Sequence, residues 1–405
     1  MVGRKEESVQ ELRGLAKTSG VISKKILYHN SLNIDPAYYI SESKLKKLQE
    51  EICSSEINVI IFDNELTPAQ HRNIEEELEI KIIDRTQLIL DIFAQHAHTK
   101  ESKIQVELAQ LEYLLPRLKG KGEEMSRLAG GIGTRGPGES KLEVDRRRIE
   151  KKIHRLKKKL KKISKIRENQ RKNRKDPLIA LVGYTNAGKS TLMNLLTEAK
   201  TEVADKLFAT LDSTLRSLTL PVGKKVVLSD TIGFINRLPH QLIASFQSSL
   251  EEIKNAELLL HVIDINQKDP ESKIDVVKNV LKDMDIGNKN IIKVFNKCDL
   301  ISKEKRQEMN LRYPESINIS AQTGRGKDKL INKINSVIKK SMNNVNLKIP
   351  YDQANLVDEI YQQGTVFEEE YHKDHISIEA LVSKQLANKL TPYRTKKQKT
   401  KSPFL

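Results

Sequence analysis

The sequence of 405 residues has no tryptophan, two cysteines and no long apolar run. Cys53 and Cys298 stand far apart without the spacing of metal ligands, which excludes a disulfide framework and a cysteine-based zinc site. No apolar stretch approaches the about 18 residues of a membrane-spanning helix, and no signal-peptide pattern opens the chain. We therefore expect a cytoplasmic protein with reduced thiols, neither secreted nor integral to a membrane.

Acidic residues are scarce in one segment. The chain has a net charge of +17, and residues 141–176 carry 18 Lys and Arg against 5 Asp and Glu. A concentrated excess of charge creates a field, whereas a dispersed excess is largely solvated. Because neither Trp nor Phe accompanies this block, it predicts a nucleic-acid partner in preference to a membrane. A charged helix that is merely solvated remains the alternative.

The first segment, residues 1–98, alternates strand-like and helix-like stretches. Its order predicts a small α/β domain with a parallel sheet. His96 and His98 have no third ligand in view, so we expect a surface or packing role for them and no metal site. The strand-like stretches lie at 24–29, 57–63 and 80–84, and the helix-like ones at 42–52 and 68–79.

From residue 99 the apolar period changes to that of a coiled coil. Two seams with spacings of 4, 3, 4 and 3 predict an antiparallel helical hairpin over 99–176, in which Pro116 ends or kinks the first helix. The connection "GGIGTRGPGES", 130–140, has five glycines and would form a bare, narrow tip, with a flexible linker as the alternative. The seams are Ile104, Leu108, Leu111, Leu115 and Leu118, and Ile149, Ile153, Leu156, Leu160 and Ile163.

The segments at 177–342 and 343–405 predict two more domains. Short β-branched and leucine runs separated by helical patterns predict a mostly parallel sheet with helices on both faces in the first. "QANLVDEIYQQG" and "HISIEALV" predict a small α+β domain in the second, with a basic, disordered tail at 393–405.

"GYTNAGKS", residues 183–190, matches the P-loop pattern, follows a strand and opens a helix. Its glycines let backbone N–H groups surround phosphate oxygens, and the helix N-terminus favours the negative charge. Lys189 is expected to reach the β- and γ-phosphates, and the Ser190 hydroxyl to bind Mg²⁺.

Three further motifs follow in the order typical of GTP-binding proteins. In "DTIG" (230–233), Asp230 would hold the metal through water and the Gly233 backbone would sense the γ-phosphate. In "NKCD" (296–299), Asp299 can accept hydrogen bonds from guanine, whereas adenine would leave the carboxylate unpaired. "SAQ" (320–322) offers backbone N–H groups to guanine O6. The four elements together predict GTP binding.

The sequence indicates the residues for GTP hydrolysis less completely than those for GTP binding. "FATLDSTLRS" offers Thr210 and Thr214 to complete the Mg²⁺ shell, and spacing does not choose between them. Phe234 stands where many small GTPases have a water-orienting glutamine, so we expect slow intrinsic turnover that a partner or a monovalent ion raises. Asn186 is a candidate K⁺ ligand, and an exposed loop asparagine is the equal alternative.

The motifs "DRTQLILDIFAQHAHTKESKIQVELAQLEYLLPRL", "GGIGTRGPGES", "DRRRI", "GYTNAGKSTL", "FATLD", "DTIGF" and "NKCD" together resemble the HflX-type ribosome-associated GTPases, of the TRAFAC class and Obg-HflX-like superfamily. The resemblance runs from about residue 10 to about residue 340. It implies binding to the large ribosomal subunit and its RNA, ribosome-stimulated GTP hydrolysis, and separation of stalled or stress-damaged ribosomes into subunits. It also implies Thr210 as the Mg²⁺ ligand and makes Phe234 normal for the group. Ser140 departs from the family, which usually has Thr there, and the chain starts close to its first strand.

The predicted nucleotide site combines the motifs with this resemblance. Lys189, Thr210, Gly233 and Asn186 form the predicted catalytic group, and Ser190, Thr210 and Asp230 the metal ligands. The site comprises Gly183, Tyr184, Thr185, Asn186, Ala187, Gly188, Lys189, Ser190, Thr191, Phe208, Ala209, Thr210, Leu211, Asp212, Asp230, Thr231, Ile232, Gly233, Asn296, Lys297, Asp299, Ser320, Ala321 and Gln322.

Three functions follow as hypotheses. The first is a monomeric, Mg²⁺-dependent GTPase, with K⁺ as a candidate activator, that docks on the large ribosomal subunit and splits ribosomes. The second is a GTP-regulated, RNA-binding ribosome assembly factor or chaperone without splitting activity. The third is a signalling switch with a protein partner, which leaves the basic block unexplained.

Overall fold

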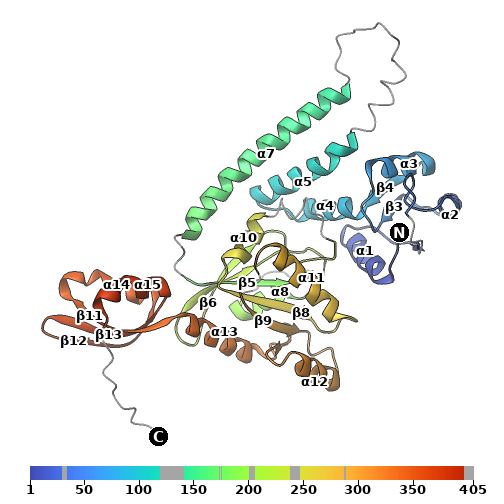
Figure 1. Cartoon of the computed structure of the whole chain (residues 1–405). Helices are drawn as coiled ribbons and strands as arrows, with labels where there is room; N and C mark the ends of the chain where they lie inside the picture. Colours follow the sequence, from blue (N-terminus) through green and yellow to red (C-terminus); the bar gives the residue numbers. More distant parts are fainter. Residues whose placement is uncertain are drawn as a thin grey trace.

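The computed structural model describes residues 1–29, 34–118, 141–172, 174, 176–199, 206–237, 247–286 and 289–395 (Figure 1). The predicted tip at 130–140 and the tail from 396 lie outside the described residues. Within the described helices, none combines the length and apolar character that crossing a membrane requires.

The N-terminal segment forms a parallel sheet of 4 strands in the order β2-β1-β3-β4, as predicted. The two-residue strand β1 was not predicted, because so short a segment shows no alternation. Thr67 caps α3 in a reciprocal pair with Gln70, which fixes where that helix begins. The elements are β1 (Val2–Gly3), α1 (Glu6–Thr18), β2 (Leu27–Tyr28), α2 (Glu42–Ser54), β3 (Val59–Phe62), α3 (Pro68–Leu78), β4 (Lys81–Asp84) and α4 (Arg85–His96).

Helices α5 (Lys100–Leu118) and α7 (Lys141–Lys172) lie side by side and antiparallel, so the predicted hairpin is confirmed (Figure 1). All of the predicted seam residues except Leu118 belong to one apolar cluster between the two helices. Pairs of opposite charge flank it, with Lys152 Nζ 2.5 Å from Glu107 and Lys157 Nζ 2.8 Å from Glu112. Pro116 lies within the last turn of α5.

The third segment forms a sheet of 6 strands in the order β10-β9-β8-β5-β7-β6, parallel except for β6 against β7. Helices α8 and α13 pack on one face, and α10 and α11 on the other, as predicted. The elements are β5 (Leu178–Gly183), α8 (Lys189–Thr197), β6 (Thr214–Thr219), β7 (Lys225–Asp230), α10 (Gln247–Asn255), β8 (Leu258–Asp264), α11 (Pro270–Asp283), β9 (Asn290–Asn296), α12 (Lys303–Arg312), β10 (Ile317–Asn318) and α13 (Lys327–Ser341).

The C-terminal segment is a small α+β unit around an antiparallel sheet in the order β11-β13-β12, with its own apolar core. Its elements are β11 (Asn343–Pro350), a 3₁₀ turn (Tyr351–Gln353), α14 (Asn355–Gln363), β12 (Thr365–Tyr371), β13 (His375–Val382), α15 (Lys384–Lys389) and a second 3₁₀ turn (Thr391–Tyr393). The fold class is therefore as predicted, while the domain boundaries at 98, 176 and 342 stay predictions.

Candidate nucleotide-binding site

The P-loop joins the carboxyl end of β5 to the start of α8. Only glycine fits two of its positions. A Cβ on Gly183 would lie 2.3 Å from the Val262 carbonyl oxygen, and one on Gly188, whose φ is +90°, would lie 2.2 Å from Asn296 Nδ2. These glycines let neighbouring strands and loops approach the backbone that is expected to hold the phosphates.

Lys189 and the "DTIG" segment close against this loop. The Lys189 ammonium donates to the carbonyl oxygens of Gly183 at 3.2 Å and Tyr184 at 2.9 Å. Burial lowers the pKa of Lys189 to about 8, with the negative charge of Asp230 opposing the shift. A Cβ on Gly233 would lie 2.8 Å from Thr185 Cα and 3.0 Å from Lys189 Nζ, so this position also requires glycine.

The three predicted metal ligands come together beside the P-loop. The Ser190 hydroxyl donates to Asp230 Oδ2 at 2.6 Å, and Thr210 Oγ1 lies 2.9 Å from Ser190 Oγ and 3.4 Å from Asp230 Oδ2. Thr214, the other candidate, starts β6 and is exposed. Thr210 is therefore the threonine at this cluster.

Asp230 has the character of a cation ligand. Its Oδ1 atom is buried and has no hydrogen-bond partner among the described residues. Burial raises the pKa of the Asp230 carboxyl group. A positive charge bound beside the carboxylate would reverse this shift. One carboxylate and two hydroxyl oxygens form the hard donor set that Mg²⁺ prefers, so the residues present fit this ion.

The base-recognition loops are fixed to the P-loop through Asn296. Its Nδ2 donates to the Ala187 carbonyl at 2.9 Å, and its Oδ1 accepts from Ala321 N at 2.9 Å. Lys297 donates to the Asn186 carbonyl at 3.1 Å. The Ala321 N–H is thus already engaged within the protein. Asp299 is exposed, so its predicted discrimination against adenine would require a bound base that covers the carboxylate.

Several side chains of the motif segments are buried or hydrogen-bonded within the protein, whereas that of Asn186 is exposed. The Phe234 side chain is fully buried between the six-stranded sheet and helices α10 and α11, and the Thr231 hydroxyl donates to the Leu181 carbonyl at 2.6 Å. Asn186 is exposed and has a φ of +60°. The side chains of Tyr184, Phe208, Leu211 and Ile232 are buried in a cluster that also contains residues of α1 and α4.

The N-terminal segment supplies contacts to this site that no motif indicated. The Tyr184 hydroxyl donates to Glu11 of α1 and accepts from Asn236 N at 2.8 Å, and burial and Glu11 both raise the pKa of Tyr184. Arg85, which is 3% exposed, pairs with Glu11 and with Asp63 at 2.9 Å and reaches the Asn236 carbonyl at 3.1 Å. These partners are distant in sequence, so only the fold could reveal them.

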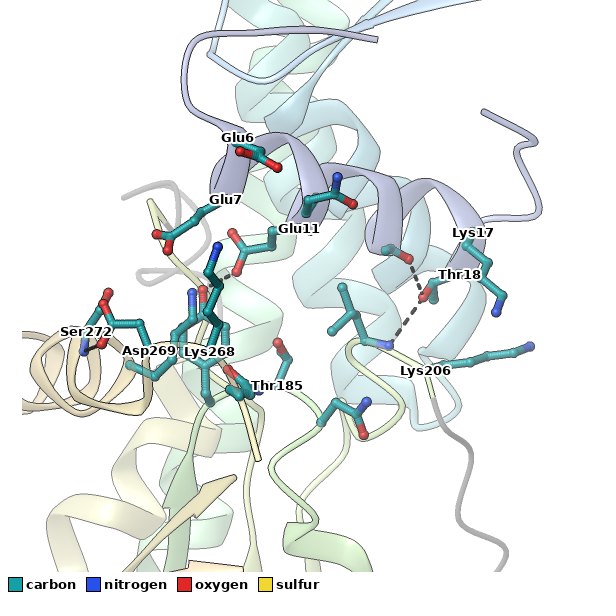
Figure 2. Close-up of a pocket in the computed structure, with 17 residues that line it drawn as sticks. Glu6, Glu7, Glu11, Lys17, Thr18, Thr185, Lys206, Lys268, Asp269 and Ser272 are labelled. Carbon is teal, nitrogen blue, oxygen red and sulfur yellow. Dashed lines mark hydrogen bonds between the residues drawn. The ribbon is translucent and has the colours of Figure 1, made fainter. Parts of the chain in front are cut away.

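Two hollows adjoin the P-loop. The larger, of about 690 Å³, lies between α1, the P-loop and the start of α11. Figure 2 shows Glu7 and Glu11 on its α1 side, facing Lys268 and Thr185. The smaller, of about 50 Å³, is lined by Lys189, Ser190, Thr210 and Gly233, which makes it the candidate phosphate site despite its size. Phe208 and Ala209 also line it.

These loops lie at the carboxyl ends of parallel strands, beside the N-terminus of a helix that carries a lysine. Loops with these contacts in this position define a P-loop GTPase. Sequence comparisons narrow the class. Four family models match in succession: GTP-binding GTPase N-terminal at 6–94, GTP-binding GTPase Middle Region at 96–174, 50S ribosome-binding GTPase at 178–297 and HflX C-terminal domain at 306–402.

Whole-length relatives agree. GTPase HflX of Caldanaerobacter subterraneus subsp. tengcongensis is 46% identical over 95% of this chain and 90% of that protein. GTPase HflX of Escherichia coli (strain K12) is 40% identical over 91% and 88%. A solved complex of SsGBP with GDP is 26% identical over 83% of this chain and 97% of that chain, with a TM-score of 0.48. On the sequence matches, the chain belongs to the HflX family of GTPases and is a GTP hydrolase.

Proposed function

We propose that this GTPase depends on Mg²⁺, binds the large ribosomal subunit, and splits stalled or stressed ribosomes into subunits in a GTP-dependent way. The observation that carries the proposal is the position of the basic hairpin: its first helix, α5, shares an apolar cluster with Phe208 and Leu211, and Asp212 binds the start of that helix. We place the protein in the cytoplasm as a monomer. Its family includes the 50S ribosome-binding GTPase domain, which supports the choice of subunit.

In this proposal the nucleotide is held by the motif residues in named roles. Lys189 binds the β- and γ-phosphate oxygens, the Gly233 N–H contacts the γ-phosphate, and Asp299 accepts from guanine. Ser190 and Thr210 bind Mg²⁺ directly and Asp230 does so through water. Held by these three residues, the ion would supply positive charge that offsets the negative charge of the phosphates.

Turnover is slow without a partner in this proposal. The Phe234 side chain is buried in the core, so it orients no water at the γ-phosphate. A K⁺ ion near the exposed Asn186 and the docked ribosome are the two proposed sources of acceleration.

RNA binding is assigned to the hairpin. Much of the outer surface of α7 consists of exposed lysines, among them Lys158, Lys161 and Lys165. Lysines that neutralise phosphates release counterions, which drives association and makes it depend on salt. The glycine-rich segment 130–140 is proposed to approach bases where larger side chains would not fit.

The first experiment measures GTP turnover with and without purified large ribosomal subunits, in K⁺ and then in Na⁺. The wild-type chain is compared with one in which 130–138 is replaced by a neutral linker of equal length. Stimulation that the replacement abolishes supports the proposal. Absence of stimulation in the wild type contradicts it and favours an assembly factor or a signalling switch. Light scattering of intact ribosomes then separates splitting from an assembly factor, since only splitting predicts GTP-dependent loss of large particles.

A second prediction concerns base recognition. Replacing Asp299 by Asn removes a charged acceptor, and hydrogen bonds to charged groups are worth about 1.5–3 kcal/mol. We expect GTP affinity to fall by about tenfold or more and XTP binding to appear, measured by nucleotide competition. The exposed Asp352, on the C-terminal unit, is the matched control. Unchanged GTP affinity in Asp299→Asn would remove this residue from the site.

A further inference from the structure

The segment that carries Thr210 is fastened to the N-terminal elements on both sides of that threonine. Before it, the Leu207 N–H donates to Thr18 Oγ1 on α1 at 3.3 Å (Figure 2). The Phe208 ring packs edge-on against Phe93 of α4, with centroids 4.7 Å apart. Because both contacts lie within three residues of Thr210, they restrict where its hydroxyl can lie.

After Thr210, the Asp212 carboxylate holds the start of α5, the first helix of the hairpin. Its Oδ2 accepts from the backbone N–H groups of His98 and Thr99, each at 3.1 Å. Its Oδ1 accepts from the Thr99 hydroxyl at 2.6 Å. Thr99 in turn caps α5, since its Oγ1 accepts from Ser102 N at 3.1 Å. A negative charge at a helix N-terminus is favourable, which adds to the hydrogen bonds.

We propose that Asp212 is a positioning residue that links two equilibria. One is the placement of Thr210 at the metal cluster, the other is the placement of the hairpin, and through Asp212 each shifts with the other. This inference rests on the proposed function, because it says how the bound ribosome reaches the GTPase site. In the structure the Asp212 contacts coexist with Thr210 at 2.9 Å from Ser190 Oγ, the arrangement that suits Mg²⁺. The contacts therefore stabilise the metal-binding conformation.

Linkage makes the effect reciprocal. If bound Mg²⁺ and GTP hold Thr210 in place and thereby favour one position of α5, then RNA that binds the hairpin in that position must favour Mg²⁺ and GTP by the same factor. Asp212 was predicted to belong to the nucleotide site, but its carboxylate is bonded to His98 and Thr99, so in this scheme it touches neither the RNA nor the reacting atoms. Replacing Asp212 should therefore weaken the coupling between the metal cluster and the hairpin more than it weakens binding at either site alone.

The test uses the full chain in two assays. One is the Mg²⁺ concentration for half-maximal GTP hydrolysis without ribosomes. The other is the ratio of dissociation constants for large subunits with GDP and with a non-hydrolysable GTP analogue. We expect Asp212→Ala to raise the Mg²⁺ requirement about tenfold, the effect of losing about 1.4 kcal/mol, and to bring the ratio close to one. Thr99→Val should shift both in the same direction by less, and Thr99→Ser should restore them.

Thr67→Ala is the matched control, because it removes a helix cap of the same kind from α3 without touching the Thr210 segment. It should leave both readouts at the wild-type value. If Asp212→Ala leaves both unchanged, the proposal is overturned. If the wild type itself shows no nucleotide-dependent binding to large subunits, the proposed function fails, and the Mg²⁺ requirement alone tests Asp212. A shift in this requirement that is confined to the Asp212 and Thr99 variants supports the positioning role. Absence of any shift overturns it.

Discussion

His261 lies in the middle of β8, 4% exposed, within the GTPase sheet. Burial lowers its pKa to about 3, and the positive charges of Lys293 and Lys189 add to the effect. In the unfolded chain the same imidazole takes up a proton near pH 6.5. Between these two values the unfolded state binds more protons, so stability falls as the pH falls from about 6.5 toward about 3.

Replacing His261 by Leu removes this titration and keeps a similar volume in the core. The acid limb of a stability-versus-pH curve, measured by urea unfolding from pH 7 to pH 4, should become flatter for His261→Leu. His154→Leu, on the exposed surface of α7, should keep the wild-type slope. Equal slopes in all three proteins would show that His261 is not held neutral.

At the scale of single residues, the sequence predicts functional residues that lie together in one short stretch of the chain. The P-loop, "DTIG" and "NKCD" could be located because each is a short stretch whose chemistry depends on its own backbone. Glu11, Arg85 and Thr99 could not, since their partners Tyr184, Asn236 and Asp212 are brought to them only by tertiary packing. Tyr184 shows the limit most clearly, because the side chain of this P-loop residue is hydrogen-bonded to Glu11 of α1.

At the scale of elements, the hairpin is held by a narrow apolar seam inside a highly charged surface. Ile153 and Leu156 are the most buried residues that α7 contributes, at 8% and 2% exposed. The 4, 3, 4, 3 spacing predicted this seam because coiled-coil packing depends on local period alone. The two-residue strand β1 escapes such reasoning, since its pairing partners β2 and β3 and not its own pattern define it.

Leu156→Ala should destabilise the hairpin by about 3 kcal/mol, the usual cost of emptying a buried leucine site. Because α7 packs chiefly on α5, the loss should appear as faster amide hydrogen exchange along both helices, with the GTPase sheet unchanged. Ile166→Ala removes a side chain that is 59% exposed and should leave exchange as in wild type. Uniform acceleration throughout the chain would instead mean that the hairpin unfolds only with the rest.

At the scale of the whole molecule, the basic hairpin extends from the N-terminal segment, and its helix α5 shares an apolar cluster with residues beside the candidate phosphate site (Figure 1). The composition of the hairpin predicted its positive charge, and the spacing of its apolar residues predicted its shape. Neither could predict that α1, α4 and the start of α5 contact the Thr210 segment, because that interface is formed by apolar and polar residues scattered over the N-terminal segment.

The charge of the hairpin gives a prediction for the assembled system. Lys158, Lys161 and Lys165 are exposed on α7, and changing all three to Gln should weaken binding to large subunits. If each neutralises one phosphate, the slope of log affinity against log salt should become shallower by about 2 to 3, measured by pelleting between 50 and 200 mM salt. Lys329, Lys339 and Lys340, exposed on α13, changed to Gln in the same way, form the matched control. Intrinsic GTP turnover should be equal in both variants, since none of the six lysines lies at the candidate phosphate site. Equal loss of affinity in the two variants would mean that net charge, and not the hairpin, attracts the RNA.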